Sequence, residues 1–286
     1  MILIADSGST KTQWYLTNND QIFTFDTIGY NPIILSTVEI KRSLEGSFIP
    51  QVSKYIDKIK TIYFYGAGCS STLAQSELKS CLSPIFHEGT TISVKSDLWA
   101  CIYASCGLNK GICSILGTGS NACVYEGGEI VDQLPSLGFI LGDEGSGGQI
   151  GKRLVYHYFY RELPTHLAQL FEAKYEIEEH QFVKKLYSDL RPNQFLASFA
   201  NFAVEHRKDS FIQKLLKDCF DSFVKAHLLK FEQAKQLPIH FVGSVAFGFR
   251  EELEEVMIRH QLRLGKVLKT PFPDLLDYHL ALNLDI

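Results

Sequence analysis

Short turns that combine glycine with hydroxyl or carboxylate side chains follow several apolar segments of this chain. The first is the turn 6–11, DSGSTK, between the apolar runs 1–5 and 12–16. Its backbone N–H groups and hydroxyls could bind a phosphate, with Asp6 near a divalent cation. The alternative is an ordinary hairpin turn, since Gly, Ser and Asp are common turn residues. A P-loop NTPase is excluded, because Thr10 rather than a glycine precedes Lys11.

The second turn is GTGS, residues 117–120, after the apolar run 111–116. Its glycines let the backbone approach an anion closely, and its hydroxyls add hydrogen-bond donors. GTGSNA also matches a dinucleotide-binding fingerprint, which requires the loop to open into a helix. The residues that follow alternate in polarity and contain Gly127-Gly128, which indicates two strands joined by a hairpin. The pattern therefore disfavours a Rossmann site.

Two further turns carry candidate ligand-binding residues. GDEGSG, residues 142–147, leads into a predicted helix, and its alternative role is an acidic N-cap. Its glycines exceed what a cap requires, which favours close approach of a ligand or metal. GSVAFG, residues 243–248, follows the apolar run 239–242, and a tight strand-to-helix turn explains it equally well.

Asp97 is the carboxylate best placed for catalysis. It ends a predicted strand, 90–97, and directly precedes a predicted helix, 98–106, where Ser96 or Asp97 could simply cap the helix. Ligands of open α/β sheets gather beyond the carboxyl ends of strands, and Asp6 and GTGS occupy equivalent positions. A carboxylate there could accept the proton of an attacking hydroxyl, as phosphoryl transfer requires.

The elements that must position these turns form two similar series. Predicted strands cover 1–5, 12–16, 21–28, 60–68, 90–97, 111–116, 121–134 (as a hairpin), 238–242 and 265–271. Predicted helices cover 37–49, part of the segment up to 59, 71–82, 98–106, much of 147–235, 249–262 and 273–283. Each half thus begins with three antiparallel strands and continues as strand–helix alternation, which indicates an α/β protein with two such halves.

Composition excludes several classes of function. The 286 residues are 45% hydrophobic and 21% charged, enough for the cores of two domains. The net charge of −4 and the lack of a basic run argue against nucleic-acid binding. No apolar run could span a bilayer, and no leader precedes the first strand, so a cytoplasmic protein is expected. Seven scattered cysteines without a CxxC pair predict buried, reduced thiols, and the histidines lack metal-site spacing.

Taken together, DSGSTKT, SDLWA, GTGSN, GDEGSGG and FVGSVAFGF resemble the sugar-kinase, heat-shock-protein and actin superfamily of ATPases. The greatest similarity is to the BadF/BadG/BcrA/BcrD-type ATPase family, which includes N-acetylglucosamine kinases. This resemblance covers nearly the whole chain. It implies an α/β fold of two actin-like (ribonuclease H-like) lobes, 1–107 and 108–286, with ATP and Mg²⁺ in an interlobe cleft. A helical insertion would span about 150–235, and the last helix could pack back on the N-terminal lobe.

The resemblance also implies a role for each candidate residue. Asp97 would be the base for a sugar hydroxyl, expected at C6. Asp6 would hold Mg²⁺ through water. The remaining implied contacts are to phosphates (Gly8, Ser9, Thr10, Lys11, Thr12, Gly117, Thr118, Gly119 and Ser120), to the nucleoside (Gly243 and Ser244) and to the sugar (Asn31, Asp143 and Glu144). Vertebrate-type N-acetylglucosamine kinases carry a glycine-rich stretch with a tryptophan before GDEGS, whereas Leu137 stands here. The resemblance therefore implies N-acetylglucosamine, or a relative such as N-acetylmuramic acid, as the expected sugar.

Two alternatives from other classes remain at this point. One is an ATPase activator of a 2-hydroxyacyl-CoA dehydratase, which would hold an iron–sulfur cluster between two subunits. Cys113 and Cys123 flank GTGS, but neither lies in a cluster motif. The other is a non-catalytic sugar or nucleotide sensor, which has no use for a base such as Asp97. A sugar is the expected partner, and a homodimer is left open.

Overall fold

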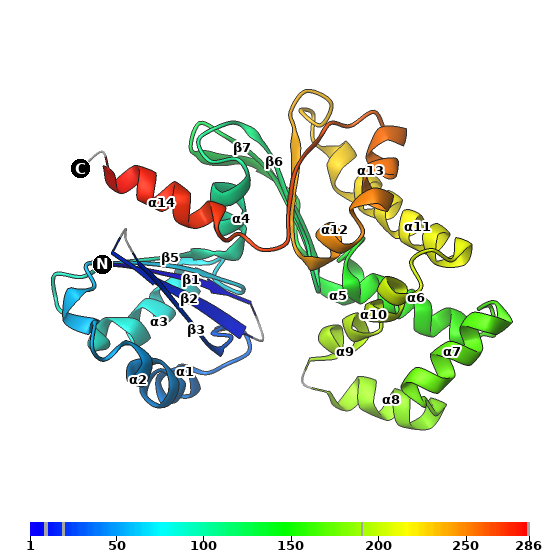
Figure 1. The fold of residues 1–286 in the computed structure, drawn as a ribbon, viewed down its shortest axis with the longest axis horizontal. Coiled ribbons are helices and arrows are strands. Elements are labelled where there is room, and N and C mark those ends of the chain that lie inside the picture. Colours follow the sequence, from blue (N-terminus) through cyan, green and yellow to red (C-terminus); the bar gives the residue numbers. More distant parts are fainter. Residues whose placement is uncertain (9–10, 19–20, 190, 285–286) are drawn as a thin grey trace. The chain divides into compact units, whose positions relative to one another are not determined.

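The computed structural model describes residues 1–8, 11–18, 21–189 and 191–284. The chain forms two compact units, drawn in Figure 1. Unit 1 contains Met1–Ala104 together with the segment that begins at Pro271, and unit 2 contains Ser105–Thr270. Each unit is built on its own five-stranded mixed sheet.

The sheet of unit 1 has the strand order β3-β2-β1-β4-β5. Its strands are β1 (Ile2–Ser7), β2 (Lys11–Thr17), β3 (Ile22–Ile28), β4 (Thr61–Gly66) and β5 (Thr91–Ser96). The first three strands pair antiparallel, while β4 and β5 run parallel to β1. This confirms the predicted series of three antiparallel strands followed by strand–helix alternation.

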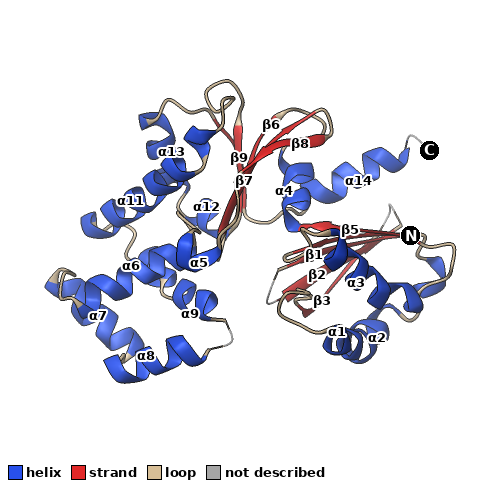
Figure 2. Ribbon diagram, turned by 180° about the vertical axis from the view of Figure 1, so that it is seen from behind, coloured by secondary structure: helices blue, strands red, loops and turns tan. Residues whose placement is uncertain are grey.

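Alternation along the strands assigns the two faces of this sheet. Leu3, Ala5 and Trp14 point into one hydrophobic core, where they meet Phe48 and Leu78. The helical segments that cover this face are α1 (Thr37–Ser43), a π-helical turn (Leu44–Phe48), α2 (Ile49–Val52) and α3 (Thr72–Leu82), and Figure 2 shows them together on one side. The predicted helix 37–49 therefore extends to 52, whereas a short 3₁₀ turn, Ile56–Lys58, replaces the second predicted helix.

The opposite face of the same sheet carries the last helix, α14 (Asp274–Leu284). His279 of this helix is 2% exposed, and its Nε2 lies 2.7 Å from the hydroxyl of Tyr65. Its ring also stacks on Tyr63, with centroids 3.9 Å apart. A polar and aromatic contact therefore fixes the segment after residue 270 on the sheet of unit 1.

Unit 2 repeats this strand arrangement with the order β10-β9-β6-β7-β8. Its strands are β6 (Gly111–Leu116), β7 (Ser120–Glu126), β8 (Glu129–Gln133), β9 (Ile239–Val242) and β10 (Leu264–Leu268). The predicted hairpin is confirmed, and Gly127 and Gly128 both have positive φ angles, +63° and +89°. Because GTGS opens into β7 rather than a helix, the structure also rules out the Rossmann reading.

Helices account for most of the rest of unit 2. They are α5 (Gly138–Leu141), α6 (Gly147–Phe159), α7 (Thr165–Tyr175), α8 (Glu179–Ser188), α9 (Pro192–Ser198), α10 (Ala200–Glu205), α11 (Ser210–Ala226), α12 (Ser244–Gly248) and α13 (Arg250–Arg259). The preceding helix, α4 (Asp97–Ser105), belongs to unit 1 up to Ala104. Phe220 and Phe223 of α11 pack with Leu116 and Phe241 of the sheet in one core. No helix among the described residues is long and apolar enough to cross a membrane.

Candidate active site residues in each unit

Asp6 and Asp97 lie at the same edge of the unit 1 sheet. Asp6 is near the end of β1, and Asp97 begins α4 directly after β5, so parallel pairing through β4 aligns the two strand ends. Burial raises the pKa of Asp6 to about 7, and the nearby Asp97 carboxylate adds to this rise. Burial also raises the pKa of Asp97, although its carboxylate accepts a hydrogen bond from the Leu98 N–H at 3.0 Å. Binding of a proton or a cation would reduce the electrostatic repulsion between these two carboxylates.

The surroundings of Asp6 fit a hydrated magnesium ion. Mg²⁺ is usually held by one or two carboxylates together with waters and phosphate oxygens. Asp6 supplies a half-buried carboxylate whose ionised form a cation would stabilise. Within the described ranges, no group of three or more His, Cys, Asp or Glu could hold a metal ion. Magnesium at Asp6 would therefore depend on water and on the ligand's own oxygens.

The first glycine–hydroxyl turn is held by hydroxyls at its base. Ser7 Oγ and Thr12 Oγ1 lie 2.7 Å apart, and Ser7 Oγ accepts from the Tyr30 N–H at 3.0 Å. Thr12 is fully buried and donates its hydroxyl to the Ile28 carbonyl at 2.9 Å. The hydroxyl of Thr12 thus stabilises the strand ends from within β2, where Thr12 lies between Ser7 of β1 and Thr27 of β3.

The remaining residues of this turn differ in exposure and partners. The Gly8 N–H donates to the Lys11 carbonyl across the turn, at 2.9 Å. Lys11 itself is half-exposed and forms a 2.9 Å salt bridge with Asp26. Ser9 and Thr10, which were also predicted to bind phosphate, lie outside the described residues.

Asn31 forms the second polar position of unit 1, together with Gly68. The side chain of Asn31 is buried, and its Oδ1 accepts from the Ile33 N–H at 2.9 Å. Gly68, in the loop after β4, has a φ of +81°, and a Cβ on it would lie 2.1 Å from Asn31 Oδ1. That loop joins the end of β1 through the Ala67 N–H, which donates to the Ser7 carbonyl at 2.8 Å.

In unit 2, the GTGS turn rests on the start of α6. The N–H groups of Gly147 and Gly148 donate to the carbonyls of Gly117 and Thr118, at 2.8 and 3.1 Å. These bonds fix the backbone of the turn while the Thr118 side chain stays exposed. The turn is thus rigid at its base and accessible at its tip.

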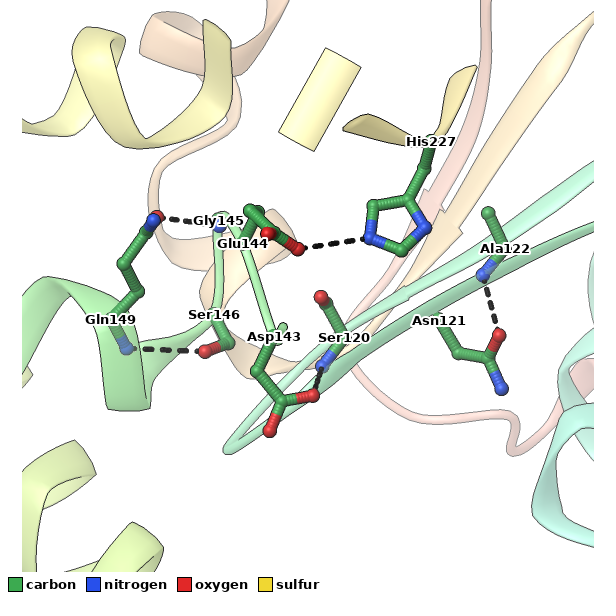
Figure 3. A network of polar contacts seen from close by, with 9 residues as sticks. All are labelled: Ser120, Asn121, Ala122, Asp143, Glu144, Gly145, Ser146, Gln149 and His227. Carbon is green, nitrogen blue, oxygen red and sulfur yellow. Dashed lines mark hydrogen bonds and ion pairs between the residues drawn. The ribbon is translucent and has the colours of Figure 1, made fainter. Parts of the chain in front are cut away.

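Asp143 ties the GDEGS loop to the same turn, as Figure 3 shows. Its Oδ1 accepts from the Ser120 N–H at 3.0 Å, and a Cβ on Gly119 would lie 2.9 Å from that oxygen. Asp143 adopts a positive φ of 60°, uncommon for a residue with a side chain. Burial raises its pKa, against the lowering effect of the Ser120 hydrogen bond. Ser120 thus meets Asp143 through its N–H, and its buried hydroxyl has no partner in the described part of the chain.

Glu144 points away from Asp143 and contacts His227 at the end of α11. Its Oε2 lies 3.1 Å from His227 Nε2, with side-chain exposures of 26% and 10%. The cap of α6 is Ser146, whose Oγ accepts from the Gln149 N–H at 3.2 Å. The acidic N-cap alternative is therefore wrong: neither acidic residue caps the helix, and both serve other contacts.

Gly243 brings the fourth turn against the second. It has a φ of +134°, and a Cβ there would lie 2.2 Å from the Leu116 carbonyl oxygen. Its N–H donates to the Leu268 carbonyl at 2.9 Å, while the following residue, Ser244, is exposed at the start of α12. Unit 2 therefore gathers three of the predicted turns, 117–120, 142–147 and 243–248, at one end of its sheet.

The sequence did not identify His227 or Gly68 as part of the site. His227 lies 83 residues from Glu144 and has no motif around it, so nothing local marked it. Gly68 had a weak signal, because it follows a predicted strand in a glycine-containing loop. Its contact with Asn31 depends on the tertiary fold.

No protein-family profile matches the chain, and no curated protein does either. Among solved structures, a candidate N-acetylglucosamine kinase from Porphyromonas gingivalis superposes with a TM-score of 0.93 and 36% identity, over 98% of both chains.

Two more distant structures share the fold. A candidate N-acetylglucosamine kinase from Chromobacterium violaceum has a TM-score of 0.74 and 15% identity, over 97% of this chain and 98% of its own. A ROK family glucokinase from Streptomyces griseus, in complex with glucose and AMPPNP, has a TM-score of 0.52 and 12% identity, over 96% and 97%. The 36% identity over 98% of both chains places this protein in the same family as the candidate N-acetylglucosamine kinase from Porphyromonas gingivalis. The protein therefore belongs to the actin-like sugar kinases.

Proposed function

We propose that the protein is an ATP-dependent amino-sugar kinase that phosphorylates a hydroxyl, at C6, of N-acetylglucosamine or a related N-acetylhexosamine. The observation that carries this proposal is the 36% identity to the Porphyromonas protein over 98% of both chains. A sugar and ATP as the two substrates also agree with the glucokinase structure of the same fold, which holds glucose and AMPPNP.

Asp97 is proposed as the general base. Its carboxylate would take the proton of the sugar hydroxyl while that oxygen bonds to the γ-phosphorus and the bond to ADP breaks. Burial raises the pKa of Asp97, which makes the carboxylate a better proton acceptor. Mg²⁺, when bound beside Asp6, would neutralise charge on the phosphate oxygens.

The remaining candidate residues are proposed to bind the two substrates. Phosphates would contact the turns 8–12 and 117–120, and Thr12 would support the first turn from within β2, because its buried hydroxyl bonds Ile28. Gly243 and Ser244 would contact the nucleoside, and Asn31, Asp143 and Glu144 the sugar. Each assignment rests on the family's motif at that position.

The identity of the sugar depends on the segment before GDEGS. Leu137, Ile140 and Leu141 are 59%, 72% and 73% exposed around the short helix α5, close in sequence to Asp143. These apolar side chains offer a surface for the acyl group of an N-acetylhexosamine, and for the larger lactyl ether of N-acetylmuramic acid. Both sugars therefore belong in the test.

The activator alternative is less well supported. Cys113 and Cys123 face each other on β6 and β7, and both are fully buried. Burial raises the pKa of Cys123 to about 12, which favours the neutral thiol over the thiolate that an iron–sulfur cluster needs. These positions suit core packing better than a cluster shared between two subunits.

The test is a coupled assay of ADP release with a panel of sugars. The panel contains N-acetylglucosamine, N-acetylmuramic acid, N-acetylmannosamine, glucosamine and glucose. Each sugar is tested with the wild-type protein, with Asp97→Asn and with Asp277→Asn, a control at an exposed position. We expect sugar-dependent release that falls 10²–10⁴-fold in Asp97→Asn and is unchanged in Asp277→Asn. Intact nucleotide binding without sugar-dependent release would reject the proposal.

A further inference from the structure

The contact between Glu144 and His227 joins the candidate sugar-binding loop to the C-terminal end of α11. Figure 3 shows the imidazole facing the carboxylate, at a distance of 3.1 Å between Nε2 and Oε2. The histidine side chain is 10% exposed and the glutamate side chain 26%. The carboxylate is therefore supported from the protein interior and still reaches solvent.

Phe223 fixes both partners of this contact. Its ring stacks on His227, with centroids 5.0 Å apart and 29° between the planes. A Cβ on Gly145, the residue after Glu144, would lie 2.8 Å from Phe223 Cβ. One turn of α11 thus supports the imidazole and the backbone of the loop together, which restricts both ends of the hydrogen bond.

The hydrogen bond has a defined direction. A carboxylate can only accept, so Nε2 of His227 must donate, in the neutral Nε2–H tautomer or in the cation. Nδ1 is buried and has no partner in the ranges that the structure describes. Among the described residues, the hydrogen bond to Glu144 is thus the only one that the imidazole makes, and no catalytic or phosphate-binding residue of the proposed mechanism bonds to it.

We propose that His227 is a positioning residue for the sugar: it orients the Glu144 carboxylate toward a sugar hydroxyl. This inference rests on the proposed function. Binding that is equal in the ground state and the transition state changes KM rather than kcat. Loss of the hydrogen bond should therefore weaken sugar binding while chemistry at Asp97 continues.

Two substitutions at one position separate the hydrogen bond from packing. His227→Phe keeps an aromatic ring against Phe223 but removes the donor, whereas His227→Gln keeps an N–H near the place of Nε2 and removes the ring. We expect the sugar KM of His227→Phe to rise about tenfold, the size expected for a hydrogen bond to a charged group. Its ATP KM and kcat should stay within about threefold of wild type, as should all constants of His227→Gln.

A double-mutant cycle with Glu144→Gln tests whether the two side chains act as a unit. If His227 acts through Glu144, adding His227→Phe to Glu144→Gln should raise the sugar KM by much less than tenfold. Melting temperatures measured alongside would show whether any change in KM follows a general loss of stability.

The outcomes distinguish this inference from the proposed function. If wild type phosphorylates a sugar and His227→Phe has an unchanged sugar KM, or His227→Gln is the more impaired variant, His227 serves packing and the inference is wrong. Full additivity in the cycle would also overturn it. If wild type phosphorylates no sugar, the proposed function itself fails, and a positioning role for the sugar fails with it.

Discussion

Gly68 and Asn31 occupy adjoining space so tightly that a single methyl group on Gly68 would lie 2.1 Å from Asn31 Oδ1. The positive φ of Gly68, +81°, is also one that residues with a Cβ rarely adopt. The glycine after β4 therefore determines where the predicted sugar-binding asparagine lies.

Gly68→Ala should consequently cost stability and displace Asn31. We expect the free energy of unfolding to fall by about 2–4 kcal/mol, from backbone strain and steric overlap, and the sugar KM to rise. Gly107→Ala is a matched control, because Gly107 also has a positive φ, +60°, but nothing lies within 4 Å of its Cβ position. Denaturant unfolding and sugar kinetics of both variants would check this, and equal effects would show that strain alone matters.

Thr12 and Thr118 should respond in opposite ways to substitution by valine. Thr12→Val removes a buried hydroxyl that bonds Ser7 and Ile28, so we expect a loss of about 1–3 kcal/mol in stability with little change in ATP KM. Thr118→Val changes an exposed side chain on the GTGS turn, so we expect unchanged stability and a higher ATP KM. A rise in ATP KM from Thr12→Val at normal stability would instead place its hydroxyl on the nucleotide.

The raised pKa of Asp6 predicts that the ligand-free protein loses stability as pH rises. The folded protein holds a proton on Asp6 up to a pH of about 7, whereas the unfolded chain releases it near the ordinary value of 3.8. Stability from this group is therefore complete below about pH 4 and is lost as pH rises through 7.

Asp6→Asn should remove that dependence. At pH 8 without Mg²⁺ we expect the variant to be more stable than wild type by about 1–2 kcal/mol, with the difference vanishing toward pH 4. Its kinase activity should collapse if Asp6 acts as proposed, since an amide cannot replace a carboxylate at the proposed magnesium site. Paired melts across pH would check this, and a constant difference between the two proteins would contradict it.

His279 should make the protein sensitive to acid. Burial lowers the pKa of His279 to about 4, with a smaller contribution from Lys95. Below pH 6.5 the His279 imidazole binds a proton in the unfolded chain but not in the folded protein. The free energy of unfolding therefore falls as pH drops from 6.5 toward 4. His279→Gln keeps a polar partner for Tyr65 and should flatten this part of the stability profile. The exposed His87→Gln is the control, and an unchanged slope in His279→Gln would refute the assignment.

The strands could be predicted because their pattern is local. Residues 1–5 form a continuous apolar run that ends at the turn 6–11, and this pattern indicates a buried strand although it does not reveal that Leu3 and Ala5 share one face of the sheet. Both sheets therefore follow from short segments and from turn chemistry such as Gly127-Gly128.

The contacts that build the site depend on residues far apart in the sequence. No local pattern connects Glu144 with His227, 83 residues later, or reveals that the Thr12 hydroxyl turns inward to Ile28. The helix 37–52 likewise ran past its predicted end, because a π-helical turn carries the backbone through Gly46 and on to Pro50. Such features are decided by packing, which a reading of single segments does not include.

The return of the chain to unit 1 at Pro271 has a consequence for biosynthesis. The aromatic strip of β4, Tyr63 and Tyr65, receives its covering helix only after residues 105–270 have been translated. Unit 2, a continuous stretch, can fold as soon as it leaves the ribosome, while unit 1 must wait with part of one sheet face uncovered. The first domain to begin is thus the last to finish, and this interval is when a nascent chain would most need a chaperone.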